Sequence, residues 1–195
     1  MSKSLNSSSD EPLMNPITEV EVMRSIKITP YDIVNELSSA FGYCGYWART
    51  KVTNYNGLRR VTTEEIRKFI DENGGPEAFQ TYSEIAKGMM PFKSSITYSL
   101  DALNQMKGYQ YSEQIPLLGG EITVYDSESG VWNEEIEDYE REELGVINAR
   151  SIEAGIHLFA EHGHRHFDDF MNQGGDAITA DVLLQYIVMG KVVYG

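Results

Sequence analysis

Cysteine, basic residues and long apolar runs are all scarce in this chain of 195 residues. The single cysteine, Cys44, excludes an internal disulfide framework and a cysteine-rich zinc site, and a lone thiol is what a reducing compartment permits. No apolar run approaches the roughly 20 residues that a membrane-spanning helix needs. The first 16 residues lack the apolar core of a signal peptide. These absences predict a protein of the cytoplasm with no membrane partner.

Positive charge is also in short supply, with 16 Lys and Arg residues against 30 Asp and Glu residues and a net charge of −14. A protein that neutralises nucleic-acid phosphates needs a basic surface, so direct nucleic-acid binding is not expected. The segment 133–144 concentrates seven acidic residues around Arg141. Such a run is typical of a solvated face or a mobile loop. The alternative is an acidic surface that imitates DNA and binds a protein.

Length and hydrophobic content predict one folded domain over residues 17–195, preceded by a disordered or loosely attached arm over 1–16. Helix-starting signals recur along this domain. Thr29 is a favourable N-cap, and Thr62 with Glu65 has the spacing of a capping box. Apolar residues at helical spacing predict helices at 30–42, 62–75, 76–90, 149–163, 165–175 and 176–190.

Aromatic and β-branched residues predict a few strands among these helices. Residues 43–55 are expected to form one strand, and residues 94–108 to pass from a strand into a short helix. Residues 119–135 carry the clearest hairpin signal, with two apolar stretches on either side of the polar turn "DSESG". The expected fold class is therefore α+β, a mainly helical single domain with a small antiparallel β-sheet.

All four histidines lie between residues 157 and 166. His162 and His166 are four residues apart, a spacing that places two imidazoles on one helix face. Asp169 adds a carboxylate to that face if a single helix runs through the segment, although Gly163 favours a helix end there. A divalent metal held by His162, His166 and Asp169 is one interpretation, and no other cofactor is expected.

Two other interpretations of the histidines remain open. They can surround a helix junction whose core contacts are Phe159, Phe167 and Phe170. Alternatively, His164 and His166 can face an anionic ligand, because an imidazole with a pKa of about 6.5 binds phosphate when it is protonated. The sequence does not decide among packing, ligand and metal.

Tyr43, Tyr46 and Trp47 form an aromatic group beside Arg49. Such rings can stack on a base while a nearby cation meets a phosphate, and the alternative is that they are plain core residues. Further cations for a local pocket follow at Lys51, Arg59 and Arg60. No phosphate-binding glycine-rich loop, nucleophile elbow or dinucleotide fingerprint is present, so a binding protein is favoured over an enzyme.

The C-terminal segment "DAITADVLLQYIVMGKVVYG", with "HRHFDDF" before it and "GYCGYWA" near the start, resembles a family of small, mostly uncharacterised tailed-phage proteins. The residues that carry the resemblance are Asp176, Ala180-Asp181-Val182, Gln185, Gly190 and the closing Tyr194-Gly195. The resemblance covers the C-terminal segment and, more loosely, the aromatic stretch, but not the middle of the chain. It implies a phage accessory protein in the host-cell cytoplasm, without an established activity.

Three functional hypotheses follow. The first is a non-enzymatic inhibitor of host defence that sequesters a small nucleotide-like signal in a homo-oligomer. Its ligand-binding residues are expected to be Tyr43, Tyr46, Trp47, Arg49, His164 and His166. The second is an acidic inhibitor that binds a host protein through 133–144, and the third is a metal-dependent hydrolase built on the histidines. The closing "VVYG" is expected to pack against the core or against a neighbouring chain.

Overall fold

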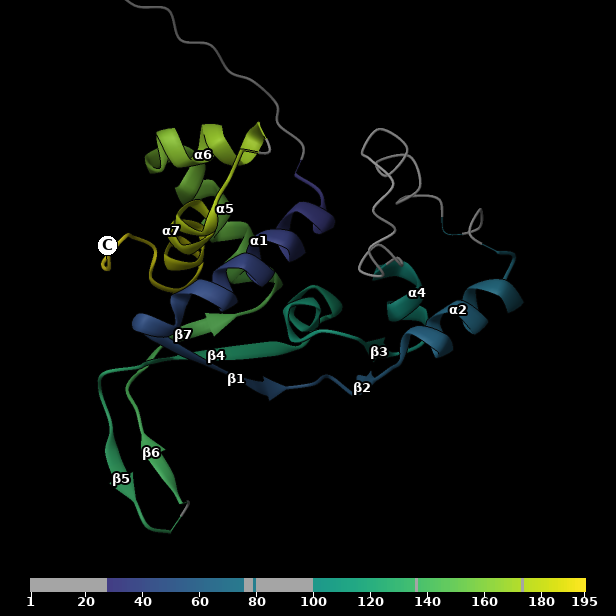
Figure 1. The fold of residues 1–195 in the computed structure, drawn as a ribbon, viewed down its shortest axis with the longest axis horizontal. Coiled ribbons are helices and arrows are strands. Elements are labelled where there is room, and N and C mark those ends of the chain that lie inside the picture. Colours follow the sequence, from purple (N-terminus) through teal and green to yellow (C-terminus); the bar gives the residue numbers. More distant parts are fainter. Residues whose placement is uncertain (1–27, 76–78, 80–99, 136, 173) are drawn as a thin grey trace, which may run out of the picture.

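Three antiparallel strands form the central sheet of the computed structural model, which describes residues 28–75, 79, 100–135, 137–172 and 174–195. The strand order is β1-β4-β7, and helices gather on one side of the sheet (Figure 1). This arrangement confirms the predicted α+β fold with a small antiparallel sheet. The strands are β1 (Ala48–Asn54), β4 (Glu121–Asp126) and β7 (Glu143–Ile147), and the helices are α1 (Pro30–Tyr43), α5 (Ala149–His162), α6 (His164–Met171) and α7 (Ala177–Met189).

Helix α7 is the centre of the main hydrophobic core. It packs against α1, α5 and β7, and every residue from Thr179 to Ile187 is buried. Two glycines permit the close approach of these elements. A Cβ at Gly145 of β7 would lie 2.5 Å from the carbonyl oxygen of Val188, and a Cβ at Gly155 of α5 would lie 2.5 Å from Cα of Ile187. Any larger side chain at either position would push α7 away.

The predicted helix starts are confirmed where the structure describes them. Thr29 caps α1, and Thr62 caps α2 (Thr63–Glu72) in the predicted capping box with Glu65. The strand expected from residue 43 begins later, however. Helix α1 continues to Tyr43 and is followed by a 3-10 turn, η1 (Cys44–Tyr46), so that β1 starts only at Ala48. The aromatic residues before β1 therefore belong to a corner and not to the sheet.

The hairpin predicted over 119–135 is wrong in its pairing. Its first strand, β4, is the central strand of the sheet and pairs with β1 and β7. Its second strand, β5 (Val131–Asn133), pairs with β6 (Asp138–Glu140) instead. The β5–β6 hairpin projects from the sheet on the side opposite to the helices (Figure 1).

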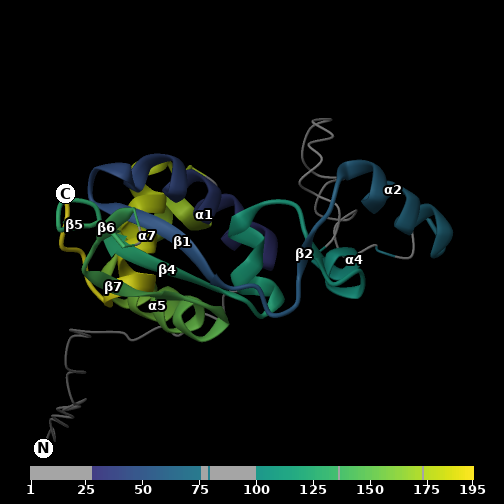
Figure 2. The same cartoon turned by 90° about the horizontal axis from the view of Figure 1, so that it is seen from below.

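A second hydrophobic cluster lies at the other end of the molecule, around β2 (Arg59–Arg60), β3 (Gly108–Tyr109), α2, α4 (Leu100–Gln105) and the 3-10 helix η4 (Ser112–Leu118) (Figure 2). Its buried members include Ile66, Leu103 and Ile115. The short helix expected near residue 100 is α4. The helix predicted at 76–90, the strand predicted at 94–99 and the N-terminal arm lie outside the described residues, apart from the buried Phe79.

None of the helices described in the structure combines the length and the apolar character that crossing a membrane requires.

Candidate functional site

A parallel pair of two-residue strands, β2 and β3, lies next to a pocket whose lining begins at Arg60 of β2 and includes Gln110 and Tyr111, which follow β3. β2 and β3 are paired with Arg60 opposite Tyr109, and the Val61 N–H donates to the Tyr109 carbonyl at 2.8 Å. Gly108 makes this approach feasible, because a Cβ there would lie 2.6 Å from Val61 Cγ1. The pairing brings the start of α2 next to the loop that leads into η4, although the two segments are far apart in sequence.

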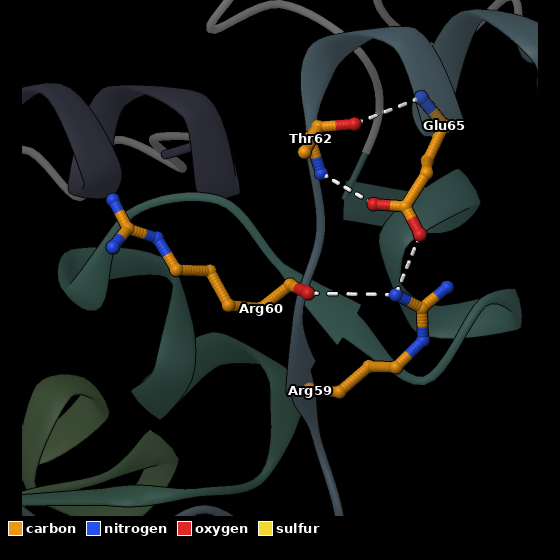
Figure 3. A network of polar contacts seen from close by, with 4 residues as sticks. All are labelled: Arg59, Arg60, Thr62 and Glu65. Carbon is orange, nitrogen blue, oxygen red and sulfur yellow. Dashed lines mark hydrogen bonds and ion pairs between the residues drawn. The ribbon is translucent and has the colours of Figure 1, made fainter.

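Reciprocal hydrogen bonds fix the start of α2 (Figure 3). The Glu65 N–H donates to Thr62 Oγ1 at 3.2 Å, and the Thr62 N–H donates to Glu65 Oε2 at 2.7 Å. Arg59 donates to the other carboxylate oxygen, Oε1, at 2.8 Å. The hydrogen bond from Thr62, followed by that from Arg59, lowers the pKa of the Glu65 carboxyl. Arg59 is therefore already paired with Glu65, and the first turn of α2 is fixed by its cap.

Arg60 differs from its neighbour because its guanidinium is free of ion pairs with other described residues. Its side chain extends away from Arg59 and Glu65, on the other side of the strand (Figure 3). The Arg60 carbonyl accepts a hydrogen bond from Arg59 at 3.4 Å, which ties down the backbone while leaving the side chain exposed. An exposed cation that forms no ion pair with a described residue is available to a ligand in a chain with a net charge of −14.

Gln114 positions the opposite wall of the pocket. This side chain is buried, and its Oε1 accepts hydrogen bonds from the N–H groups of Gln110 at 2.9 Å and Tyr111 at 3.0 Å. Gln110 in turn donates from Nε2 to Thr63 Oγ1 at 2.8 Å, across the gap to α2. The backbone that carries the exposed Tyr111 ring is thus held in place by a buried amide.

The resulting pocket has a volume of about 540 Å³. This size falls within the range of roughly 300–1,000 Å³ that small-molecule sites occupy. Its chemistry combines one cation, one exposed aromatic ring, one carboxylate and several amide or hydroxyl groups. The described residues that line it are Arg60, Val61, Thr62, Thr63, Glu64, Gln110 and Tyr111.

The aromatic residues expected to bind a ligand are placed differently. Trp47 is 1% exposed, and its Nε1–H donates to Asp181 Oδ1 at 2.7 Å, so its ring cannot stack on a ligand. Tyr46 donates from its hydroxyl to Asp181 Oδ2 at 2.9 Å. The Tyr46 ring stays about half exposed, as does that of Tyr43, which it contacts edge to face. Trp47 is therefore a core residue, which was the alternative interpretation from the sequence.

The Asp181 carboxylate is also connected, through Gln185, to the C-terminal tail. Gln185 donates from Nε2 to Asp181 at 2.9 Å and to the Tyr194 carbonyl at 2.8 Å. Its Oε1 accepts from the N–H groups of Val193 and Tyr194, both at 2.8 Å. Tyr194 then stacks on Trp47 with ring centroids 5.0 Å apart. The tail therefore packs against the chain's own core, which is one of the two arrangements expected for the closing residues.

The remaining expected ligand residues do not meet these aromatics. Arg49 is exposed and donates to the Gly45 carbonyl at 2.8 Å. His164 and His166 lie on α6, which sits on the far side of the helical layer from the sheet (Figure 1). His166 makes its contact with Thr179 of α7, between Nδ1 and Oγ1 at 3.2 Å. The ligand site proposed from the sequence is therefore split between two places.

The residues of the metal interpretation belong to two helices, His162 to α5 and His166 with Asp169 to α6. Gly163 ends α5 and begins α6, so His162 and His166 do not share one helix face. Across the described residues, no three His, Cys, Asp or Glu side chains are grouped so that they could hold a metal ion. The structure thus does not bring His162, His166 and Asp169 together as one set of ligands. Phe159, Phe167 and Phe170 pack together at the junction instead, with centroids 5.5–6.2 Å apart.

Sequence reasoning identified Arg60 as a local cation but missed Tyr111 and Gln114. No local pattern marks either residue, because their role depends on the pairing of β3 with β2. No protein-family model, curated protein or solved structure matches this chain. The resemblance to tailed-phage proteins therefore stays a prediction from the sequence.

Proposed function

We propose that the protein binds a small nucleotide-like ligand without chemical turnover, in the pocket at the start of α2. The observation that carries this proposal is that Arg60 and Tyr111 both line one open pocket of about 540 Å³. A guanidinium forms strong, charge-assisted hydrogen bonds with a phosphate. An aromatic ring stacks on any base, because every base has a π-face.

Glu64 adds a carboxylate to the pocket lining, which suits the sugar of a nucleotide-like ligand. A carboxylate is an acceptor for ribose hydroxyls, as in dinucleotide-binding sites. It also offsets the charge of Arg60, so the lining suits a ligand with one or two phosphates better than a polyanion. The described lining residues include no histidine or cysteine, which supports binding over catalysis. Given the tailed-phage resemblance, the biological setting that we propose is sequestration of a host-defence signal in the infected cell.

Isothermal titration calorimetry tests this proposal with the four ribonucleoside monophosphates and a cyclic dinucleotide as probes. At least one of them is expected to bind. Arg60→Ala should weaken that binding by roughly 10-fold to 150-fold, because a hydrogen bond to a charged group contributes about 1.5–3 kcal/mol. Tyr111→Ala should weaken it by a similar factor through the lost stacking, which is worth about 1–3 kcal/mol per base.

Arg67→Ala is the matched control. Arg67 is exposed on α2 outside the pocket, so this variant removes the same charge and leaves the lining intact. Its affinity should stay within about twofold of the wild type. The proposal fails if none of the probes binds, or if Arg60→Ala and Arg67→Ala have equal effects.

A further inference from the structure

The β5–β6 hairpin exposes an apolar surface that has no partner in the described structure. Trp132 is 51% exposed and Tyr139 48%, and these two side chains share one face of the hairpin, whereas the neighbouring Val131, 75% exposed, lies on the opposite face because strand side chains alternate. Trp132 and Tyr139 face each other across the two strands, with ring centroids 5.2 Å apart in an edge-to-face contact. An isolated two-stranded hairpin is marginally stable in water, and exposed Trp and Tyr side chains are enriched at the centres of protein interfaces.

The base of the hairpin is fixed to the central sheet. The Asp126 N–H donates to the Glu142 carbonyl at 2.9 Å, and the Glu142 N–H donates to Ser129 Oγ at 3.0 Å. Asp126 Oδ1 also accepts hydrogen bonds from the N–H groups of Glu128 and Ser129. The hairpin is thus held by its base as it extends from the body (Figure 1), which lowers the entropic cost of docking it into a partner.

Charge determines what kind of partner fits. All seven carboxylates of residues 133–144 belong to exposed side chains. Arg141 is the one cation of this segment, and it lies 5.1 Å from the centre of the Tyr139 ring and 3.4 Å from Asp138. Seven carboxylates against one guanidinium leave a net charge of −6 on the segment. A second copy would bring another net charge of −14 against this surface, whereas a basic partner would be attracted.

We propose that the β5–β6 hairpin is a docking element for a protein with a basic surface, into which it inserts Trp132. The apolar face supplies affinity in an apolar depression of the partner, and the surrounding carboxylates supply orientation and association rate. This surface lies well apart from the α2 pocket (Figure 1). The proposal therefore does not depend on the nucleotide-like ligand.

A random-sequence peptide library displayed on phage particles is the probe for the first test. The library is panned on the immobilised full chain and counter-selected on the Trp132→Ser/Tyr139→Ser variant. Enriched peptides are expected to carry Lys or Arg on either side of an apolar residue. Enrichment of peptides without basic residues, or no enrichment over the counter-selected variant, would overturn the proposal.

A synthetic copy of the most enriched peptide then allows the two contributions to be separated by fluorescence anisotropy. Trp132→Ser should weaken binding at least about tenfold. The triple variant Glu134→Gln/Glu135→Gln/Glu137→Gln should weaken it and reduce its salt dependence. The control Glu153→Gln/Glu161→Gln/Asp168→Asn neutralises three exposed acids on α5 and α6. It should leave both properties unchanged, as should Arg60→Ala.

Sedimentation velocity tests the alternative that a second copy of this chain, and not a basic partner, covers the hairpin. If the wild type self-associates and Trp132→Ser abolishes that association, a second copy covers the hairpin and the proposal is wrong. We expect Trp132→Ser to leave the association state of the protein unchanged, because the hairpin is then free to bind the basic partner.

Discussion

At the scale of single residues, Asp181 has the most demanding role in the described chain. It is 3% exposed, yet each of its carboxylate oxygens is paired with the side chains described above. A buried carboxylate is tolerated only when donors replace its lost hydration. Here the donors come from η1, α7 and the corner before β1, so a single side chain connects segments more than 130 positions apart in sequence.

Asp181→Ala should lower the free energy of unfolding by about 3 kcal/mol. The substitution leaves the buried indole N–H of Trp47 without an acceptor and removes one partner of Gln185, and each unsatisfied buried group costs about 1–3 kcal/mol. Urea unfolding followed by circular dichroism measures the change. Asp181→Asn, which keeps an acceptor oxygen, should lose less. A loss below about 0.5 kcal/mol for Asp181→Ala would show that the network is not needed for stability.

Tyr46 gives a pH dependence to the same network. Desolvation, followed by its hydrogen bond to Asp181, raises the pKa of the Tyr46 phenol. The unfolded chain releases this proton near the ordinary value of about 10, whereas the folded chain retains it. The contribution to stability is therefore complete below about pH 10 and is lost as the pH rises further. Tyr46→Phe should show a shallower loss of stability than the wild type as the pH rises above about 10 in urea unfolding. Parallel losses in the two proteins would contradict this assignment.

At the scale of elements, the crossing of α5 and α7 depends on Gly155. Alanine is a better helix former than glycine by about 1 kcal/mol. Even so, Gly155→Ala should lower the free energy of unfolding by about 1–3 kcal/mol, because its methyl group would overlap Ile187. The reverse exchange at the exposed neighbouring position, Ala154→Gly, should cost only about 1 kcal/mol. Thermal unfolding of the two variants provides the comparison, and a stabilised Gly155→Ala would disprove the close contact.

The elements also show how far the sequence predicts the structure. Helix boundaries were predictable because caps such as Thr29, Thr62 and Asn148 act on the backbone within three or four residues. Strand pairing was not predictable. A hairpin of β4 with β5 has the right local signals, but both hydrogen-bonding edges of β4 are taken by other strands, β1 on one and β7 on the other. Those partners lie far away in sequence, where local patterns carry no information.

The candidate site illustrates the same limit. Arg60 was identifiable as a cation in an acidic chain, whereas Tyr111 becomes its neighbour only through the β2–β3 pair. The aromatic residues at 43–47 were correctly seen as a group, but their burial against Asp181 depends on α7. A sequence pattern can thus identify the residue types that suit a function, while their meeting point depends on tertiary contacts.

At the scale of the whole molecule, the described residues divide into two hydrophobic clusters that share Val52 of β1 at their boundary. The α2 pocket belongs to one cluster and the β5–β6 hairpin extends from the other (Figure 1). An acidic hairpin and a pocket with a free arginine can coexist because they lie far apart. The two proposed binding events are expected to be independent, so each can be removed by substitution without loss of the other.

The central position of α7 has a consequence for biosynthesis. This helix follows all the other described helices and strands in the chain, yet α1, α5 and β7 all pack against it. While the ribosome is still translating, α1 and the sheet strands emerge with their apolar faces uncovered, and Trp47 emerges long before Asp181. The main core can close only after α7 has left the exit tunnel. This part of the molecule therefore cannot complete its fold before residues 177–189 have been made, and a nonsense mutation anywhere before residue 177 would remove the helix against which α1, α5 and β7 pack.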